Sequence, residues 1–185
     1  MRIITGKYGH RRFQVPASFN ARPTTDFAKE NLFNVLENMV DWEALEALDL
    51  FSGTGSISFE MLSRGCRSVT AVELNYKHAI FIEKVAKELQ SNELTIIRGD
   101  VWRYLSSAVK PSFGLIFADP PYDLPKLQEL PNLVLNGGIL CEGGVFVLEH
   151  SKEHHFESLP YFTQQRTYGS VNFSIFLKAA ARKDA

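Results

Sequence analysis

The chain lacks several residue types and segments that define large classes of protein. It holds only two cysteines, Cys66 and Cys141, among 185 residues, too few for a disulfide framework or a four-ligand zinc site. It has no apolar run of about 18 residues, so no segment is predicted to span a membrane. Residues 1–6 lack the apolar stretch and cleavage site of a signal peptide. We therefore expect a cytoplasmic globular protein whose cysteines are small buried residues.

Charge is nearly balanced overall but unevenly distributed. The formal net charge is −1, yet residues 1–25 contain five basic residues and no acidic one, since the first acid is Asp26. That segment is therefore +5, and the remainder must be −6. A basic arm (1–25) before a mildly acidic domain (26–185) favours an anionic partner, although an ordinary solvated edge would also explain it. The basic residues of the arm are Arg2, Lys7, Arg11, Arg12 and Arg22.

The hydrophobic pattern predicts an α/β fold. Residues 2–5 and 12–15 read as a short N-terminal β-hairpin that turns at Gly6 and Gly9, and Thr25 is a plausible N-cap for the helix that follows. Strands and helices then alternate, which indicates a mostly parallel sheet with helices on both faces. The strands are expected at 45–51, 68–72, 94–98, 113–118, 145–148, 164–168 and 172–177, and the helices at 56–63, 76–89, 101–109 and 126–135. The last two strands have only a short link between them and should form an antiparallel hairpin. Such a seven-stranded sheet resembles the class I methyltransferase fold, which is Rossmann-like.

Polar residues at the ends of the first three strands predict an adenosine pocket. Gly53 and Gly55 would let the backbone turn tightly and approach a ligand at the carboxyl edge of the sheet. Glu73, 20 residues after Gly53, could accept hydrogen bonds from both ribose hydroxyls, and Asp100 could accept from an adenine amine. The alternatives are a plain strand–helix turn at the glycines and a helix N-cap at Asp100.

Two further features favour S-adenosylmethionine over a nicotinamide cofactor. A dinucleotide fingerprint requires a third glycine, but Ser58 occupies that position. Asp49 stands before the glycines as in methyltransferases, where this acid supports the methionine end of the cofactor. The residues predicted to bind the cofactor, with S-adenosylhomocysteine as its product, are Asp49, Phe51, Ser52, Gly53, Thr54, Gly55, Glu73, Leu74, Asp100 and Val101.

The fourth strand runs directly into Asp119-Pro120-Pro121-Tyr122. Two prolines hold the backbone extended and remove two amide donors, so the loop presents acceptors, the Asp119 carboxylate and the Pro120 carbonyl. Acceptors on the hydrogens of an exocyclic amine localise its lone pair and stabilise the charge that develops. Tyr122 offers a flat face for stacking of the base. A stiff surface turn is the alternative, but the position beside the glycine loop favours catalysis, and the chemistry needs no metal.

With these motifs the chain resembles the family of bacterial 16S rRNA (guanine(966)-N(2))-methyltransferases. The similarity covers nearly the whole chain and rests on the segments 2–8, 22–26, 49–55, 62–65 and 119–122, of which Arg22-Pro23-Thr24-Thr25 is the most specific. It implies that Asp119 to Tyr122 hold the target guanine, and that the arm, including Thr24, grips 16S rRNA in a small-subunit or assembly particle. His10, Phe27, Ser56 and Ser58 depart from the family pattern.

Competing interpretations share parts of this pattern. DNA adenine-N6 methyltransferases share the catalytic loop but usually carry a target-recognition insertion, and protein glutamine methyltransferases typically have asparagine at the position of Asp119. Another RNA or a small molecule as substrate is a further alternative, and a non-catalytic RNA-binding module would be expected to have lost Asp119. The histidines His150, His154 and His155 are expected at the surface rather than in a metal site, and no obligate protein partner is evident. The role of Glu149 stays open.

Overall fold

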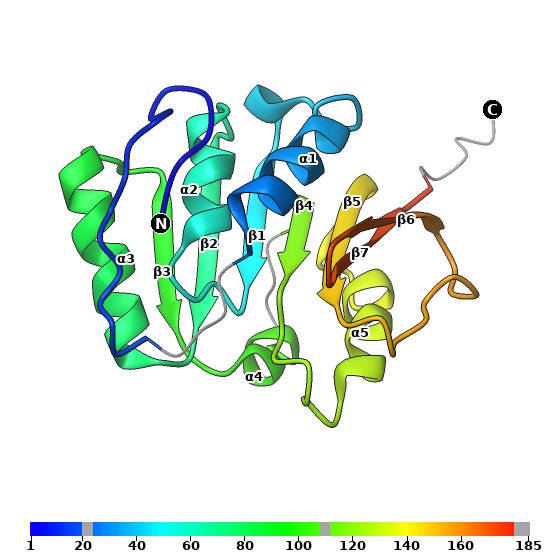
Figure 1. Ribbon diagram of the computed structural model, residues 1–185. Helices are drawn as coiled ribbons and strands as arrows, with labels where there is room; N and C mark the ends of the chain where they lie inside the picture. Colours follow the sequence, from blue (N-terminus) through cyan, green and yellow to red (C-terminus); the bar gives the residue numbers. More distant parts are fainter. Residues whose placement is uncertain (20–23, 108–111, 180–185) are drawn as a thin grey trace.

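The centre of the molecule is a seven-stranded sheet, seen in a computed structural model that describes residues 1–19, 24–107 and 112–179 (Figure 1). The strand order is β3-β2-β1-β4-β5-β7-β6. The first five strands pair in parallel, and β7 is antiparallel to both of its neighbours. The strands are β1 (Glu46–Leu50), β2 (Ser68–Glu73), β3 (Leu94–Arg98), β4 (Phe113–Ala118), β5 (Leu140–His150), β6 (Phe162–Tyr168) and β7 (Val171–Leu177).

Helices cover both faces of the sheet (Figure 1). One apolar cluster joins the sheet to α1 (Asp26–Leu36), α2 (Ser56–Ser63) and α3 (Tyr76–Leu89), and it also includes buried residues of the N-terminal segment. The other cluster joins the opposite face to α4 (Val101–Leu105) and α5 (Leu130–Asn136). Two short 3₁₀ turns, η1 (Trp42–Ala44) and η2 (Leu127–Glu129), complete the described helical elements. None of the described helices is long and apolar enough to cross a membrane.

The predicted architecture is confirmed in its main features. The α/β alternation, the parallel sheet and the antiparallel hairpin of the last two strands are all present. Thr25 caps α1 as expected, because its side-chain oxygen accepts the amide of Ala28 at 3.1 Å. Cys66 is buried, Cys141 is half-buried, and both are free thiols.

The N-terminal hairpin is shorter than predicted. Antiparallel pairing is limited to one bridge, between Arg2 and Arg12, with a few backbone hydrogen bonds around it. The reason is that the next amides, those of Ile4 and Thr5, donate to the side chain of Glu60 instead of to a partner strand. A helix therefore replaces the second strand as the partner of this segment.

Three other elements differ from their predicted bounds. The strand expected at 145–148 is the eleven-residue β5, which continues through Gly143 and Gly144 because a register shift lets Phe113 pair with Leu140. The helix expected at 126–135 is divided into η2 and α5, and a proline in the first turn of α5 suits a new helix start. The helix expected at 101–109 ends at Leu105, and residues 108 and 109 lie outside the described part.

Candidate active site

Four carboxylates gather at the carboxyl edge of the sheet. Side chains alternate between the two faces of a strand, so residues two apart share a face. Asp49 pairs in register with Phe117, and Asp119 follows two residues later; Ala118 pairs with Leu148, which places Glu149 beside Asp119. All four side chains lie on the face of the sheet that α1, α2 and α3 cover. The four residues are Asp49, Glu73, Asp119 and Glu149.

Asp49 is buried under the start of α2. Its carboxylate accepts hydrogen bonds from both the amide, at 3.0 Å, and the hydroxyl of Ser58. Burial raises its pKa to about 7, although the bonds from Ser58 oppose the rise and the charge of Glu73 adds to it. Ser58, a departure from the family pattern, therefore anchors this acid. The ionised form of a buried carboxylate is stabilised by a nearby cation. The ammonium group of a methionine moiety would be such a cation for Asp49.

The backbone conformation of the glycine loop depends on Gly53 and Gly55. Gly53 and Gly55 have positive φ values of 55° and 74°, and a Cβ on Gly55 would lie 3.0 Å from the ring of Phe59. Glu73 accepts the amides of Gly53 and Asn75, each at 2.7 Å, so it ties the loop to the end of β2. A carboxylate has about four acceptor positions, so these bonds are compatible with further bonds from ribose hydroxyls.

The other predicted cofactor residues lie around this loop. Asp100 caps α4 by accepting the amide of Arg103 at 2.9 Å, so the N-cap alternative holds, and adenine binding by the same carboxylate stays a prediction. Leu74 is 68% exposed next to Glu73, whereas Val101 is buried. A role for Leu74 or Val101 in binding the cofactor stays a prediction.

Asp119 lies directly beside the glycine loop. Its amide donates to the carbonyl of Leu50, the last residue of β1, at 3.3 Å. The residue is half-buried, and desolvation by the surrounding protein raises the pKa of its carboxyl well above the usual value. The charges of Glu149 and Asp49 raise that pKa further. Asp119 is therefore both reachable and unusually basic for a carboxylate.

Glu149 is the site residue that the sequence did not assign. It is only 3% exposed, and it accepts the hydroxyls of Tyr122 at 3.1 Å and Thr24 at 2.9 Å. The signal available beforehand was a charged residue directly after an apolar strand, at the carboxyl edge of the sheet. Thr24, predicted to contact RNA, thus directs its hydroxyl to this buried acid.

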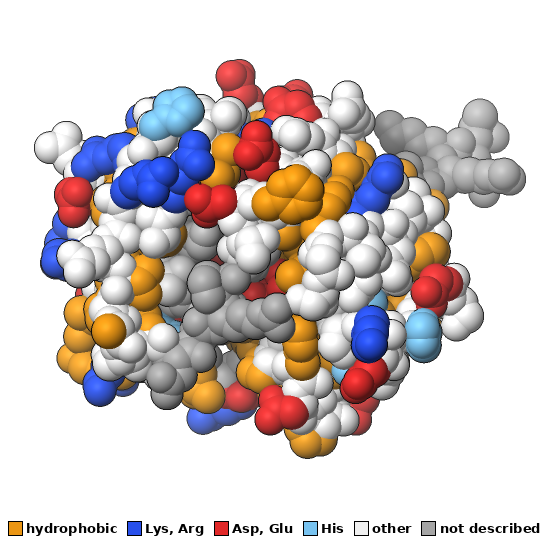
Figure 2. All heavy atoms as spheres, in the orientation of Figure 1, with side chains coloured by type: hydrophobic (Ala, Val, Ile, Leu, Met, Phe, Trp, Pro, Cys, Tyr) orange, Lys and Arg blue, Asp and Glu red, His pale blue; other side chains and the backbone are white. Residues whose placement is uncertain are grey.

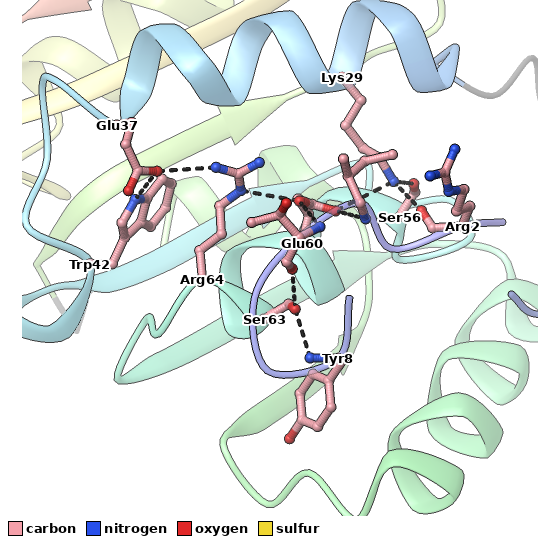
Figure 3. A network of polar contacts seen from close by, with 11 residues as sticks. Arg2, Tyr8, Lys29, Glu37, Trp42, Ser56, Glu60, Ser63 and Arg64 are labelled. Carbon is pink, nitrogen blue, oxygen red and sulfur yellow. Dashed lines mark hydrogen bonds and ion pairs between the residues drawn. The ribbon is translucent and has the colours of Figure 1, made fainter. Parts of the chain in front are cut away.

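A buried polar network ties the N-terminal segment and α1 to α2 (Figure 3). Glu60 is fully buried, accepts the amides of Ile4 at 2.7 Å and Thr5 at 3.2 Å, and forms ion pairs with Lys29 and Arg64. Lys29, also fully buried, donates to the hydroxyl of Ser56 at 2.9 Å, where the glycine loop becomes α2. Sequence reasoning missed this network because its members come from three separate segments.

The structure does not gather the predicted RNA-binding cations at the site. Lys7 lies 3.7 Å from Glu93, which directly precedes β3, and Arg11 lies 3.2 Å from Glu88 in the last turn of α3. Both cations are therefore near the edge where the strands begin, whereas Asp119 follows the end of β4. Arg2 lies 3.8 Å from Asp26 at the start of α1. Figure 2 shows basic side chains interspersed with acidic ones on the face of the molecule that is turned toward the viewer. Arg22 is outside the described residues.

The histidines near β5 have separate environments. His150 was expected at the surface, and this was wrong: it is fully buried because β7 and Phe156 cover it, and its ring bonds to Ser174 at 2.8 Å. His155 is exposed and lies 3.7 Å from Glu157. In the described part of the chain no group of three His, Cys, Asp or Glu side chains is placed to hold a metal ion.

The chain is similar to several known proteins over most of its length. Residues 1–177 match the family described as Conserved hypothetical protein 95. Ribosomal RNA small subunit methyltransferase D of Buchnera aphidicola (subsp. Baizongia pistaciae) is 31% identical over 149 residues, which cover 80% of this chain and 75% of that protein. The Escherichia coli K12 protein of the same name is 27% identical, with 97% and 91% covered. The fold is shared with the Thermus thermophilus 16S rRNA N2 G1207 methyltransferase RsmC, at a TM-score of 0.69 and 20% identity, with 89% of this chain and 46% of that chain covered.

Proposed function

The chain belongs to the Conserved hypothetical protein 95 family, and we propose that it transfers a methyl group from S-adenosylmethionine to the exocyclic N2 of a guanine in 16S rRNA. The observation that carries this proposal is the position of Asp119, whose amide is bonded to the end of the strand that leads into the glycine loop. Relatives named as small-subunit rRNA methyltransferases support RNA as the substrate class. The T. thermophilus structure of the same fold is described in complex with AdoMet and guanosine.

The residues of the site fit the cofactor. Asp49 is a buried carboxylate that an ammonium group would complement, and Glu73 is a nearly buried carboxylate that could accept hydrogen bonds from ribose hydroxyls. Gly53 leaves room for the close approach of a ligand, since only the carbonyl of Phe51, at 3.9 Å, lies within contact of a Cβ added there. S-Adenosylmethionine supplies an activated methyl group on a sulfonium, so the protein needs no further electrophile.

The chain's own groups then orient and polarise the amine. The Asp119 carboxylate and the Pro120 carbonyl accept the two hydrogens of N2, which localises the nitrogen lone pair toward the methyl group. When bound, S-adenosylmethionine would give up its methyl group and keep the electrons of the carbon–sulfur bond on sulfur, so the N2 nitrogen would have one proton to lose. Asp119 can take that proton because its pKa is raised by desolvation and by Glu149. Tyr122 provides the face on which the base stacks.

The setting of the reaction follows from the substrate. We place the activity in the cytoplasm on a small-subunit or assembly particle, without an obligate protein partner. The arm would add phosphate affinity that is independent of sequence, and the shape of the particle would supply selectivity.

The test is transfer of labelled methyl to three acceptors: undermodified small subunits, extracted 16S RNA and unmethylated DNA. We expect label in RNA as N2-methylguanine, absent with Asp119→Ala and present with the matched control Asp123→Ala, an exposed acid in the same loop. Label confined to DNA, or no label despite cofactor binding, would overturn the substrate.

A further inference from the structure

Glu149 occupies a place that the proposed chemistry does not by itself require. Its side chain is almost completely buried although it stands at the carboxyl end of β5, next to the site. On one side it pairs in register with Phe173 of β7. On the other side it neighbours Asp119, because Ala118 and Leu148 are paired one residue earlier. Burying a carboxylate in this position is costly unless hydrogen bonds compensate for the lost water.

Both oxygens of Glu149 accept a hydrogen bond, and each donor comes from a different segment. Oε1 accepts the hydroxyl of Tyr122, at 3.1 Å, from the loop after β4. Oε2 accepts the hydroxyl of Thr24, at 2.9 Å, from the segment just before α1. Hydrogen bonds to an ionised acceptor are about twice as strong as neutral ones. One side chain thus joins the catalytic loop and the N-terminal part of the chain to the central sheet.

We propose that Glu149 is the positioning residue of the target-base pocket, whose carboxylate holds the Tyr122 ring and the Thr24 segment in place on either side of Asp119. This inference rests on the proposed function, since it assigns the residue that orients the base for methyl transfer. Tyr122 is half-buried and follows the exposed Pro121, and its hydroxyl is bonded to Glu149 at 3.1 Å. A stacking face contributes only when the plane of the ring is fixed before the base arrives.

The same placement gives Glu149 an electrostatic effect on Asp119. Two carboxylates on neighbouring strand ends and on one face disfavour each other's ionisation. The charge of Glu149 is the largest cause, after desolvation, of the raised pKa of Asp119, and Asp49 of β1 adds to it. Tyr122 is a further titratable group in contact with Glu149, whereas His150, the next residue of β5, lies on the opposite face against Phe156. Because Asp119 must be ionised to accept the amine hydrogens, Glu149 helps to set the pH below which activity falls.

A purely structural role for Glu149 predicts different results. In that case its substitution would lower thermal stability and the amount of active enzyme, but the surviving enzyme would keep the wild-type pH profile. A positioning role changes kcat/KM for RNA and moves the acid limb of the profile, while the affinity for S-adenosylmethionine stays the same.

The experiment compares Glu149→Gln, Glu149→Ala, Tyr122→Phe and the double variant Glu149→Ala/Tyr122→Phe. We expect Glu149→Ala to lower kcat/KM for 16S RNA by about 100-fold, the size of effect that misplacement of reacting groups produces. Tyr122→Phe should lower it by about tenfold, the equivalent of one hydrogen bond. The double variant should resemble Glu149→Ala, because the Tyr122 hydroxyl acts through Glu149. Glu149→Gln keeps the shape but removes the charge, so it should move the acid limb to lower pH.

The controls separate the failure of this inference from the failure of the proposed function. Glu142→Gln changes an exposed acid near the other end of β5 and should leave every parameter unchanged. Cofactor affinity, measured by equilibrium dialysis with labelled S-adenosylmethionine, should stay within twofold of wild type for all variants. If wild-type protein methylates no RNA, the proposed function is wrong. If it does, and both Glu149→Gln and Tyr122→Phe keep the wild-type kcat/KM and acid limb, Glu149 is not a positioning residue. Should Glu149→Ala fail to fold, these two variants decide the question.

Discussion

Glu60→Gln tests whether the buried network holds the N-terminal segment and α1 to the body of the protein. The carboxylate of Glu60 lies 3.8 Å from the ammonium of Lys29 and 3.1 Å from the guanidinium of Arg64. The side chains of Glu60 and Lys29 are 0% exposed, so water cannot replace either partner. Glutamine keeps the volume of the side chain and removes only its charge and one acceptor oxygen.

The expected loss is large because a buried cation would be left without its closest anion. Removal of one partner from a buried ion pair costs about 3–5 kcal/mol. In a protein of this size about 1 kcal/mol corresponds to roughly 2–4 °C in Tm, so Tm should fall by about 6–20 °C. Arg64 keeps its contact with Glu37 at 3.0 Å, which limits the loss to the Lys29 side of the network. Since burial lowers the pKa of Lys29, the loss should shrink as pH rises and Lys29 becomes neutral.

Urea and thermal unfolding of the cofactor-free protein would measure this effect. The matched control is Glu46→Gln, which breaks the pair between Arg67 and Glu46, whose side chains are 64% and 37% exposed. A pair this exposed contributes at most about 1 kcal/mol. Hydrogen exchange should show faster exchange at the amides of Ile4 and Thr5 in Glu60→Gln alone. A stability equal to that of Glu46→Gln, with these amides still protected, would refute the reasoning.

Three further predictions concern the site and the arm. Asp119→Ala should lower kcat by at least about 100-fold, the effect of losing one preorganised hydrogen-bonding group in a transition state. Its S-adenosylmethionine affinity, by calorimetry, should be nearly unchanged, and a parallel loss of binding would contradict the assigned role. Asp49→Asn should become more stable relative to wild type between pH 4 and pH 7, because the pKa of about 7 means that wild type loses stability as Asp49 ionises. The gain is on the order of 4 kcal/mol, and a difference independent of pH in urea unfolding would count against it. Neutralising Arg11 and Arg12 together should weaken 16S RNA binding and flatten its salt dependence, whereas Arg67→Gln should change neither. An unchanged salt slope would remove the arm from the interface.

The position of the candidate site could be predicted from the sequence because it depends on local pattern. Each strand ends at a residue that the change in hydrophobicity marks, and parallel strands bring such ends to one edge. Gly53, Gly55 and Asp119 could therefore be placed at one edge before any contact was known. The one face shared by Asp49, Glu73 and Asp119 follows from the two-residue alternation of strands.

What only the tertiary structure decided depends on pairing between distant segments. The sequence left the role of Glu149 open, and only the approach of Thr24 and Tyr122 shows that it is buried and bonded to both. The helical pattern around Lys29 and Glu60 does not by itself show that these two charged side chains are buried. Their burial follows from the N-terminal segment crossing α2 and donating its amides to Glu60. A carboxylate at a strand end follows from periodicity within the chain, whereas its burial, its partners and its pKa are set by whatever the rest of the chain packs against it.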